Sequence, residues 1–148
     1  MKPVRVSIEV PHPREEVFDF LDVMANHERF TDHMLEEWTC SGPAAGVGAK
    51  ARVHTNVAGR TDEIDFEVIA AERPLTIVER NVGAGGRRTG TGTYTLEALP
   101  GGRTRIVFEY AWVQAPLSER LTAPLVRAYL RRGNERAMQR LAELLDAR

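Results

Sequence analysis

Two tyrosines occupy alternating positions in strand-like segments, where a phenol could take part in chemistry. Tyr94 lies in the segment 88 to 99 and Tyr110 in the segment 103 to 113, and both segments alternate apolar with polar residues. If these strands pair across a short turn, both phenols face the interior of the protein. A buried phenol needs a hydrogen-bond partner, so each hydroxyl serves either a structural hydrogen bond or a ligand.

The segment 75 to 82 brings a charged side chain to the interior in either of its two registers. If residues 71 to 74 form the preceding turn, Ile77 and Glu79 face inward. After a slip of one residue, Arg80 faces inward instead. An unpaired charge inside a protein is too costly to be incidental, so it would be paired, lie at the mouth of a cavity, or serve a function. A strand end that frays into solvent is the alternative, and the sequence leaves the register open.

The histidines, the single cysteine and the glycine run form no recognisable catalytic or metal-binding motif. His27 and His33 are six residues apart, on nearly opposite sides of a helix, whereas zinc motifs place two histidines four residues apart. We therefore expect no metal site and interpret both as surface histidines. Cys40 lacks a neighbouring base that could activate its thiol, so we expect a small strand residue. The run 83 to 86 precedes a strand and not a helix, so it is predicted to be a hairpin tip and not a phosphate loop.

The elements that must position these residues follow from hydrophobic periodicity. Residues 4 to 10 alternate as a strand, and two short helices are predicted between residues 13 and 34. Turns rich in glycine and proline then separate six further strands, at 36 to 42, 48 to 57, 62 to 71, 75 to 82, 88 to 99 and 103 to 113. Short turns between successive strands predict an antiparallel meander.

The register between predicted strands decides which residues share a face. In the last hairpin, a three-residue turn at residues 100 to 102 places apolar and small residues opposite one another. The expected pairs are Leu96 with Ile106, Tyr94 with Phe108, Gly92 with Tyr110, and Gly90 with Trp112. In the earlier hairpin, a turn from Ala58 to Thr61 would pair Val53 with Phe66 and Thr55 with Ile64.

The predicted inner face mixes bulky residues with unusually small ones. Phe66, Phe108 and Trp112 are accompanied there by Gly90 and Gly92. Either the glycines make room for the aromatic residues opposite them, or a lumen remains between the sheet and a covering helix. Such a lumen would be apolar with a few polar tips, and the sequence leaves both interpretations open.

The last segment, from Pro116 to Arg148, is predicted to be a long amphipathic helix with a break near its start. Its apolar stripe recurs at steps of three and four residues, through Val126, Leu130, Gly133, Ala137, Leu141 and Leu144. The leucines before Pro124 fall on a different side, so we expect this proline to break the helix and the first turns to close one end of a cavity. Gly133 weakens the helix by about 1 kcal/mol relative to alanine, which suggests a close contact with the sheet or space for a ligand.

Composition limits the partners of the chain. Its 20 basic and 21 acidic residues give no electrostatic case for nucleic acid or a membrane surface. A single cysteine allows no intrachain disulfide and favours a reducing compartment. No apolar run approaches the length of a membrane span, and no leader of charged and apolar residues precedes the first strand. We expect a single domain, 1 to 148, in the cytoplasm.

The chain resembles the START-like domains, also called the SRPBCC superfamily, over essentially its whole length. The resemblance rests on the opening strand followed by Pro13-Arg14-Glu15-Glu16-Val17-Phe18, on the hairpin residues 101 to 106, and on the closing segment 116 to 141. Within the superfamily it looks most similar to the polyketide cyclase/dehydrase and lipid-transport group. This implies the α+β helix-grip fold: a seven-stranded antiparallel sheet curled around the C-terminal helix, with two short helices after the first strand and a hydrophobic cavity between sheet and helix.

The function that the resemblance implies is the binding of a small hydrophobic or aromatic molecule, such as a lipid, polyketide or hormone, without a cofactor. The expected ligand contacts are Phe66, Ile77, Arg80, Gly92, Tyr94, Phe108, Tyr110, Trp112, Tyr129 and Gly133. A second interpretation is a cofactor-independent cyclase, aromatase or dehydratase in which Tyr94, Tyr110 or Glu79 would act as acid or base. A third is an interaction subunit with a closed cavity, and association into a homodimer would fit that interpretation.

Overall fold

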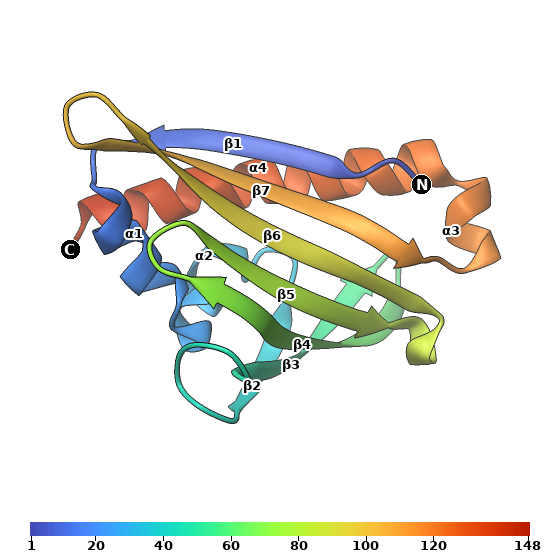
Figure 1. Cartoon of the computed structure of the whole chain (residues 1–148). Coiled ribbons are helices and arrows are strands. Elements are labelled where there is room, and N and C mark those ends of the chain that lie inside the picture. The colour runs from blue at the N-terminus through green and yellow to red at the C-terminus, as the bar shows by residue number, and fades with distance from the viewer.

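The computed structural model describes residues 1–148. Short helices that follow the first strand cover one end of a curved sheet (Figure 1). The first four elements are strand β1 (Val4–Val10), helix α1 (Arg14–Leu21), the short 3₁₀ helix η1 (Met24–His27) and helix α2 (Glu28–Thr31). Helix α1 starts after Pro13 and carries Glu15 and Glu16 in its first turn, where the helix dipole favours carboxylates. Its buried face consists of Val17, Phe18, Phe20 and Leu21. The two short helices expected after the first strand are therefore present.

A seven-stranded sheet in the order β1-β7-β6-β5-β4-β3-β2 forms the body of the protein, and every neighbouring pair is antiparallel. Its other strands are β2 (Glu36–Ser41), β3 (Lys50–Val57), β4 (Arg60–Glu72), β5 (Thr76–Gly83), β6 (Arg88–Leu99) and β7 (Arg103–Gln114). A short 3₁₀ helix, η2 (Ala84–Gly86), joins β5 to β6. The predicted strands are confirmed, with ends that differ by at most two residues. Strand β1 departs from the meander, because it pairs with β7 at the far end of the chain.

The predicted register is confirmed in the last hairpin and wrong in an earlier one. All four expected β6–β7 pairs are present, including Tyr94 with Phe108. Between β3 and β4, Val53 pairs with Ile64 and not with Phe66. The turn there contains only Ala58 and Gly59, both with positive φ, and such two-residue turns match the twist of a hairpin. The predicted register is shifted by two residues from the observed one. Because side chains alternate between faces with a period of two, every side chain keeps its predicted face.

Strand β5 adopts the register that turns Glu79 inward. Ile77 and Glu79 are 1% and 5% exposed, and Asn81 is 6% exposed. Arg80 points outward, where its guanidinium contacts the carboxylate of Glu67 at 3.0 Å. The pairing of β4 with β5 shifts by one residue between Val68 and Ala70, which marks a bulge in β4. Arg80 is therefore excluded from the inner face, which corrects its expected place among the ligand contacts.

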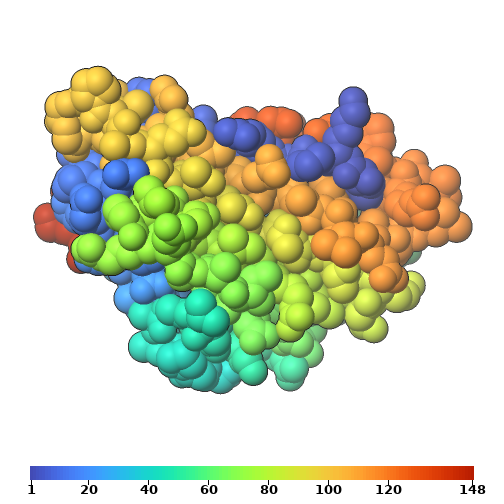
Figure 2. Space-filling view, in the orientation of Figure 1, coloured from blue at the N-terminus to red at the C-terminus, as the bar shows by residue number.

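The C-terminal segment consists of helix α3 (Leu117–Leu121) and helix α4 (Ala123–Asp146). The expected break is present, but Pro124 lies in the first turn of α4, where a missing amide donor is tolerated. Leu117, Leu121 and Leu125 are 67%, 76% and 73% exposed, so they do not close one end of the interior as expected. Figure 2 shows α3 and the start of α4 at one extremity of the molecule.

Helix α4 packs closely only along its C-terminal half. Its buried residues are Ala137, Met138, Leu141 and Leu145. Two arginines connect its N-terminal half to the start of the chain. Arg127 donates to the backbone carbonyl oxygens of Lys2 and Pro3, just before β1, and Arg131 donates to that of Arg5 in β1. In Figure 1, the C-terminal end of α4 lies with α1 and α2 at one end of the sheet, and α3 lies at the other.

These elements share one core of twenty buried apolar residues, most of them from the sheet, α1, η1, α2 and the C-terminal half of α4. A curled antiparallel sheet that holds a long C-terminal helix, with short helices after the first strand, is the helix-grip arrangement. None of its helices is both long and apolar enough to cross a membrane.

Candidate functional site

A group of polar side chains lies inside the core, on the inner face of β5 and β6. Glu79 and Asn81 point inward from β5, and Tyr94 from β6 faces the same side with 5% exposure. His27, from η1, lies against Glu79 and Tyr94 and is 3% exposed. The sheet brings the first three together because alternate residues of paired strands share a face. We call these four residues the buried polar cluster.

His27 holds one ring nitrogen against the backbone and turns the other toward Glu79. Its Nε2 lies 2.7 Å from the carbonyl oxygen of Leu21, and a carbonyl only accepts, so Nε2 is the donor. Its Nδ1 lies 3.3 Å from Oε1 of Glu79, without the geometry of a hydrogen bond. The ring also packs against Phe30 and Tyr94, with centroids 5.3 and 5.7 Å apart. The expectation of a surface histidine is therefore wrong for His27, which is fixed beside a buried carboxyl.

Burial dominates the electrostatics of the cluster. It raises the pKa of the Glu79 carboxyl, and the nearby His27 opposes that shift. Burial also raises the pKa of the Tyr94 hydroxyl well above its ordinary value, and the Glu79 charge adds to the shift. Oε1 of Glu79 and Oδ1 of Asn81 are both buried without a hydrogen-bond partner. The cluster can therefore hold or exchange a proton, and it has unsatisfied hydrogen-bonding capacity.

Further aromatic side chains lie on the sheet, on strands β2, β4 and β7. Phe66 stacks on Trp38 with centroids 6.0 Å apart, and Tyr110 meets Trp112 edge to face at 4.9 Å. Phe108 is 9% exposed, whereas Phe66, Tyr110 and Trp112 remain only half-buried. The N-terminal half of α4, which contributes no buried residue, leaves this part of the inner face incompletely covered.

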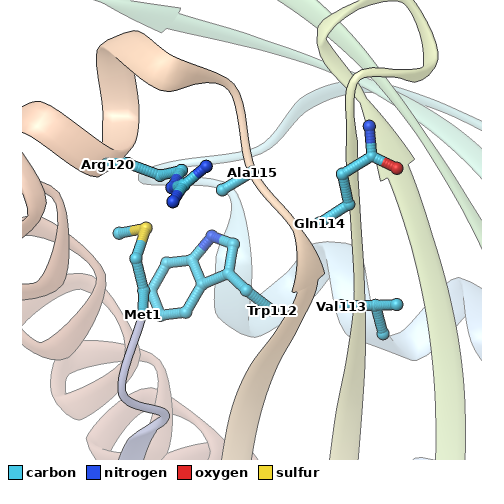
Figure 3. Close-up of a pocket in the computed structure, with 6 residues that line it drawn as sticks. All are labelled: Met1, Trp112, Val113, Gln114, Ala115 and Arg120. Atoms are coloured by element: carbon cyan, nitrogen blue, oxygen red, sulfur yellow. The ribbon is translucent and has the colours of Figure 1, made fainter.

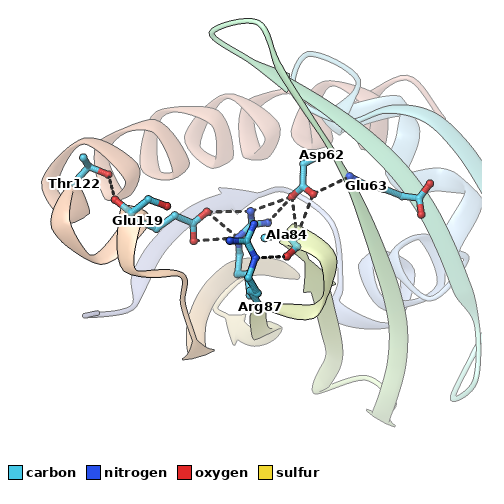
Figure 4. Close-up of polar contacts among 8 residues, drawn as sticks. Asp62, Glu63, Ala84, Arg87, Glu119 and Thr122 are labelled. Carbon is cyan, nitrogen blue, oxygen red and sulfur yellow. Dashed lines mark hydrogen bonds and ion pairs between the residues drawn. The ribbon is translucent and has the colours of Figure 1, made fainter.

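An arginine between two carboxylates links α3 to the sheet (Figure 4). The Arg88 guanidinium contacts Oδ2 of Asp62 at 3.0 Å and Oε1 of Glu119 at 2.9 Å. Asp62 also accepts a hydrogen bond from the backbone amide of Ala84 at 3.0 Å. Burial raises the pKa of Tyr110 to about 12, while the Arg88 charge opposes that shift and Glu119 adds to it. The phenol therefore stays neutral at ordinary pH.

A surface pocket of about 300 Å³ lies where β7 runs into α3 (Figure 3). Its lining residues are Met1, Trp112, Val113, Gln114, Ala115 and Arg120. Trp112 borders this pocket, and its indole Nε1 is buried without a partner. The pocket lies beside α3 and shares no lining residue with the buried polar cluster.

The two inner glycines of β6 compensate for bulky neighbours. A Cβ on Gly90 would lie 2.7 Å from the hydroxyl oxygen of Tyr110, and a Cβ on Gly92 would lie 3.0 Å from the ring of Phe108. Side chains of this size could not be added without displacing those rings. Of the two interpretations of these glycines, the structure supports close packing at both positions.

Gly133 and Tyr129, the two ligand contacts predicted on α4, do not have the surroundings that we expected. A Cβ on Gly133 would meet the end of the Met34 side chain at 3.0 Å, so its neighbour is the segment after α2 and not the sheet. The Gly133 carbonyl also accepts a hydrogen bond from Nε2 of His33 at 2.8 Å. Tyr129 is 42% exposed and lies on the half of α4 that is not buried.

The remaining predicted contacts divide between two parts of the inner face. The closely packed part contains Ile77, Gly92, Tyr94 and Phe108, and the half-buried part contains Phe66, Tyr110 and Trp112. His27 is the residue that sequence reasoning missed. The sequence offered only an indirect sign of its role, because a Glu79 that faces inward requires a partner side chain. No group of three or more histidine, cysteine, aspartate or glutamate residues is placed to hold a metal ion.

The fold and the inner face together define a helix-grip protein. The family model described as polyketide cyclase / dehydrase and lipid transport matches residues 1–146, and the chain belongs to this family. Comparison with curated proteins gives no match.

Solved structures share this fold. TTHA0849 from Thermus thermophilus is similar with a TM-score of 0.75 and 19% identity, over 99% of this chain and 98% of that one. The Zhui aromatase/cyclase from Streptomyces sp. R1128 has a TM-score of 0.75 and 18% identity, over 98% and 93% of the two chains. Ara h 8.0201 has a TM-score of 0.67 and 13% identity, over 99% of each. At these identities, the similarity shows the fold alone.

Proposed function

We propose that this protein binds a small hydrophobic or aromatic molecule between the inner face of the sheet and the N-terminal half of α4. The observation that carries the proposal is the uneven burial along α4. Its C-terminal half buries four residues and its N-terminal half buries none, and the inner-face aromatic residues Phe66, Tyr110 and Trp112 also stay half-buried. Apolar surface with a few polar groups is typical of sites for small molecules. Membership of the family supports the same class of ligand.

Uptake of an uncharged fluorescent probe, N-phenyl-1-naphthylamine, tests this proposal. We expect saturable binding of one probe per chain. Leu130→Gln should weaken uptake, because Leu130 lies two helical turns before the buried Ala137 and is partly buried itself. Leu125→Gln is the matched control, because the same substitution falls on a side chain that is 73% exposed.

Three outcomes separate the interpretations of the chain. Saturable uptake that Leu130→Gln weakens and Leu125→Gln spares supports the proposal. Equal effects of both substitutions, with folding retained, would move the binding site away from the inner face. Absence of uptake, together with association that depends on protein concentration, would favour an interaction subunit instead.

A second candidate function is a cofactor-independent enzyme of the cyclase, aromatase or dehydratase type. The observation that favours it is the buried carboxyl of Glu79, whose raised pKa suits a general acid or base and which has His27 at 3.3 Å. Tyr94 and Tyr110 remain candidates for hydrogen bonds to a substrate oxygen. Turnover of a poly-ketone substrate should fall at least tenfold in Glu79→Gln and in Tyr94→Phe, with melting temperatures close to that of the native chain. Turnover that neither substitution changes would remove this cluster from catalysis.

A further inference from the structure

Two unsatisfied acceptors lie side by side on the inner face of β5. Oε1 of Glu79 and Oδ1 of Asn81 are buried and accept no hydrogen bond, and the two residues are 5% and 6% exposed. They are two positions apart on one strand, so their side chains leave the same face about 6 to 7 Å apart. Buried acceptors without donors are rare and each is destabilising, so a pair of neighbouring ones calls for an explanation.

The strands on either side supply no donor. Glu79 is paired with Val68 of β4 and with Gly92 of β6. Asn81 is paired with Phe66 and with Gly90. None of these four neighbours has a polar hydrogen on its side chain.

The polar side chains nearby do not serve these acceptors either. Nε2 of His27 binds the carbonyl of Leu21, and the Thr31 hydroxyl binds the carbonyl of His27 at 2.7 Å. The Thr76 hydroxyl donates to the carbonyl of Tyr94 at 2.9 Å, and the Tyr94 hydroxyl donates to neither acceptor. Nδ1 of His27 lies 3.3 Å from Oε1 of Glu79 without the geometry of a hydrogen bond. Neither acceptor therefore receives a hydrogen bond in this structure, and a bound molecule could supply one to each.

We propose that Glu79 and Asn81 form a polar subsite for a hydroxylated aromatic ligand, such as a phenol. The two side chains would accept hydrogen bonds from the hydroxyl groups of that ligand. This inference rests on the proposed binding function and specifies the chemistry of its ligand. The ring of such a ligand would lie toward the half-buried aromatic side chains Phe66 and Tyr110, which continue the same face.

A hydroxyl suits this pair better than an ammonium group. Burial raises the pKa of Glu79, which favours the neutral acid, and a neutral acid gains little from a positive charge. A hydroxyl both donates and accepts, so it can satisfy Glu79 in either protonation state and can also satisfy the amide of Asn81. The apolar ring of Phe66, which is paired with Asn81, likewise disfavours a strongly hydrated cation.

Two probes of similar shape test the subsite: 2-naphthol, which has a hydroxyl, and 2-methoxynaphthalene, in which that hydroxyl is methylated. The native chain should bind 2-naphthol roughly tenfold or more tightly than the ether, as measured by fluorescence titration. In Asn81→Leu and in Glu79→Met, which remove the acceptor oxygens, this ratio should fall toward one, while affinity for the ether is retained. Glu67→Gln, on the outer face of the neighbouring strand, should leave both affinities unchanged.

The outcomes distinguish the subsite from the binding function itself. Equal affinities of the two probes for the native chain would overturn the subsite and leave the proposed function standing. A preference for 2-naphthol that survives both inner substitutions would also overturn it. If neither naphthalene probe nor N-phenyl-1-naphthylamine binds, the proposed function fails and the subsite fails with it. Thermal melting of each variant shows that the protein is folded in every comparison.

Discussion

Replacing Glu79 with glutamine should make the protein more stable. The carboxyl of Glu79 is 5% exposed, and its Oε1 has no hydrogen-bond partner although His27 lies 3.3 Å away. Because Nε2 of His27 donates to Leu21, its Nδ1 can accept a hydrogen bond from the glutamine amide. Removing an unsatisfied buried acceptor should raise the free energy of unfolding by about 1–3 kcal/mol. For a protein of this size, this corresponds to an increase in melting temperature of about 2–4 °C per kcal/mol.

The stability gained by Glu79→Gln should increase with pH. The folded-state pKa of Glu79 is raised above its ordinary value of 4.5, so the folded protein binds this proton more tightly than the unfolded chain. The stability that this group contributes is therefore fully present below pH 4.5 and is lost as the pH rises through the folded-state pKa. Glutamine does not titrate, so the advantage of Glu79→Gln should be small in acid and should increase toward neutral pH.

Urea denaturation at a series of pH values from about 4 to about 8 measures this difference. Glu67→Gln is the control, because Glu67 is a carboxylate on the outer face of the adjacent strand, and its effect should stay within about 0.5 kcal/mol. A loss of stability in Glu79→Gln that grows with pH would refute the reasoning. It would mean that the contact of Glu79 with His27 is a stabilising ion pair.

Three further predictions follow from the packing and the charges. Gly92→Ala should lower the free energy of unfolding by about 1–3 kcal/mol, as measured with urea, because its Cβ would press on the ring of Phe108 at 3.0 Å. Gly133→Ala should raise the free energy of unfolding by up to about 1 kcal/mol, because alanine favours the helix and the end of Met34 can move aside; a loss of more than that amount would show that Met34 is fixed. Tyr110 should titrate near pH 12 in an ultraviolet absorbance titration, and its raised pKa means that stability falls as the pH rises from 10 toward 12; Tyr110→Phe should remove that part of the fall.

The sequence predicted the order of elements and most strand faces, because alternation and turn residues are local signals. It placed the β3–β4 register two residues out, since the two-residue turn needs a positive φ at Ala58, a residue type that rarely adopts it. The choice between Glu79 and Arg80 depended on a bulge in β4, which no alternation pattern marks. The bulge is a response to pairing across strands and is set by tertiary structure.

The candidate site was less predictable because its partners are distant in the sequence. His27 lies in a short 3₁₀ helix, and the groups that bury it come from α1, β5 and β6. The stripe on α4 was predicted correctly as a pattern, but a pattern does not give the distance between a helix and a sheet. Leu125 and Leu130 are equally apolar, and their different exposure follows only from how α4 is placed over the sheet.

The uneven packing of α4 also has a consequence for local unfolding. Amide protons in the half that contains Ala137 and Leu141 should exchange with solvent only through large-scale unfolding, because these residues are fully buried. Amide protons near Leu125 and Tyr129 should exchange through smaller openings, because those side chains are largely exposed. A bound molecule that fills the space beneath this half would slow exchange there and leave the other half unchanged. Hydrogen exchange along a single helix would therefore report occupancy without a label on the ligand.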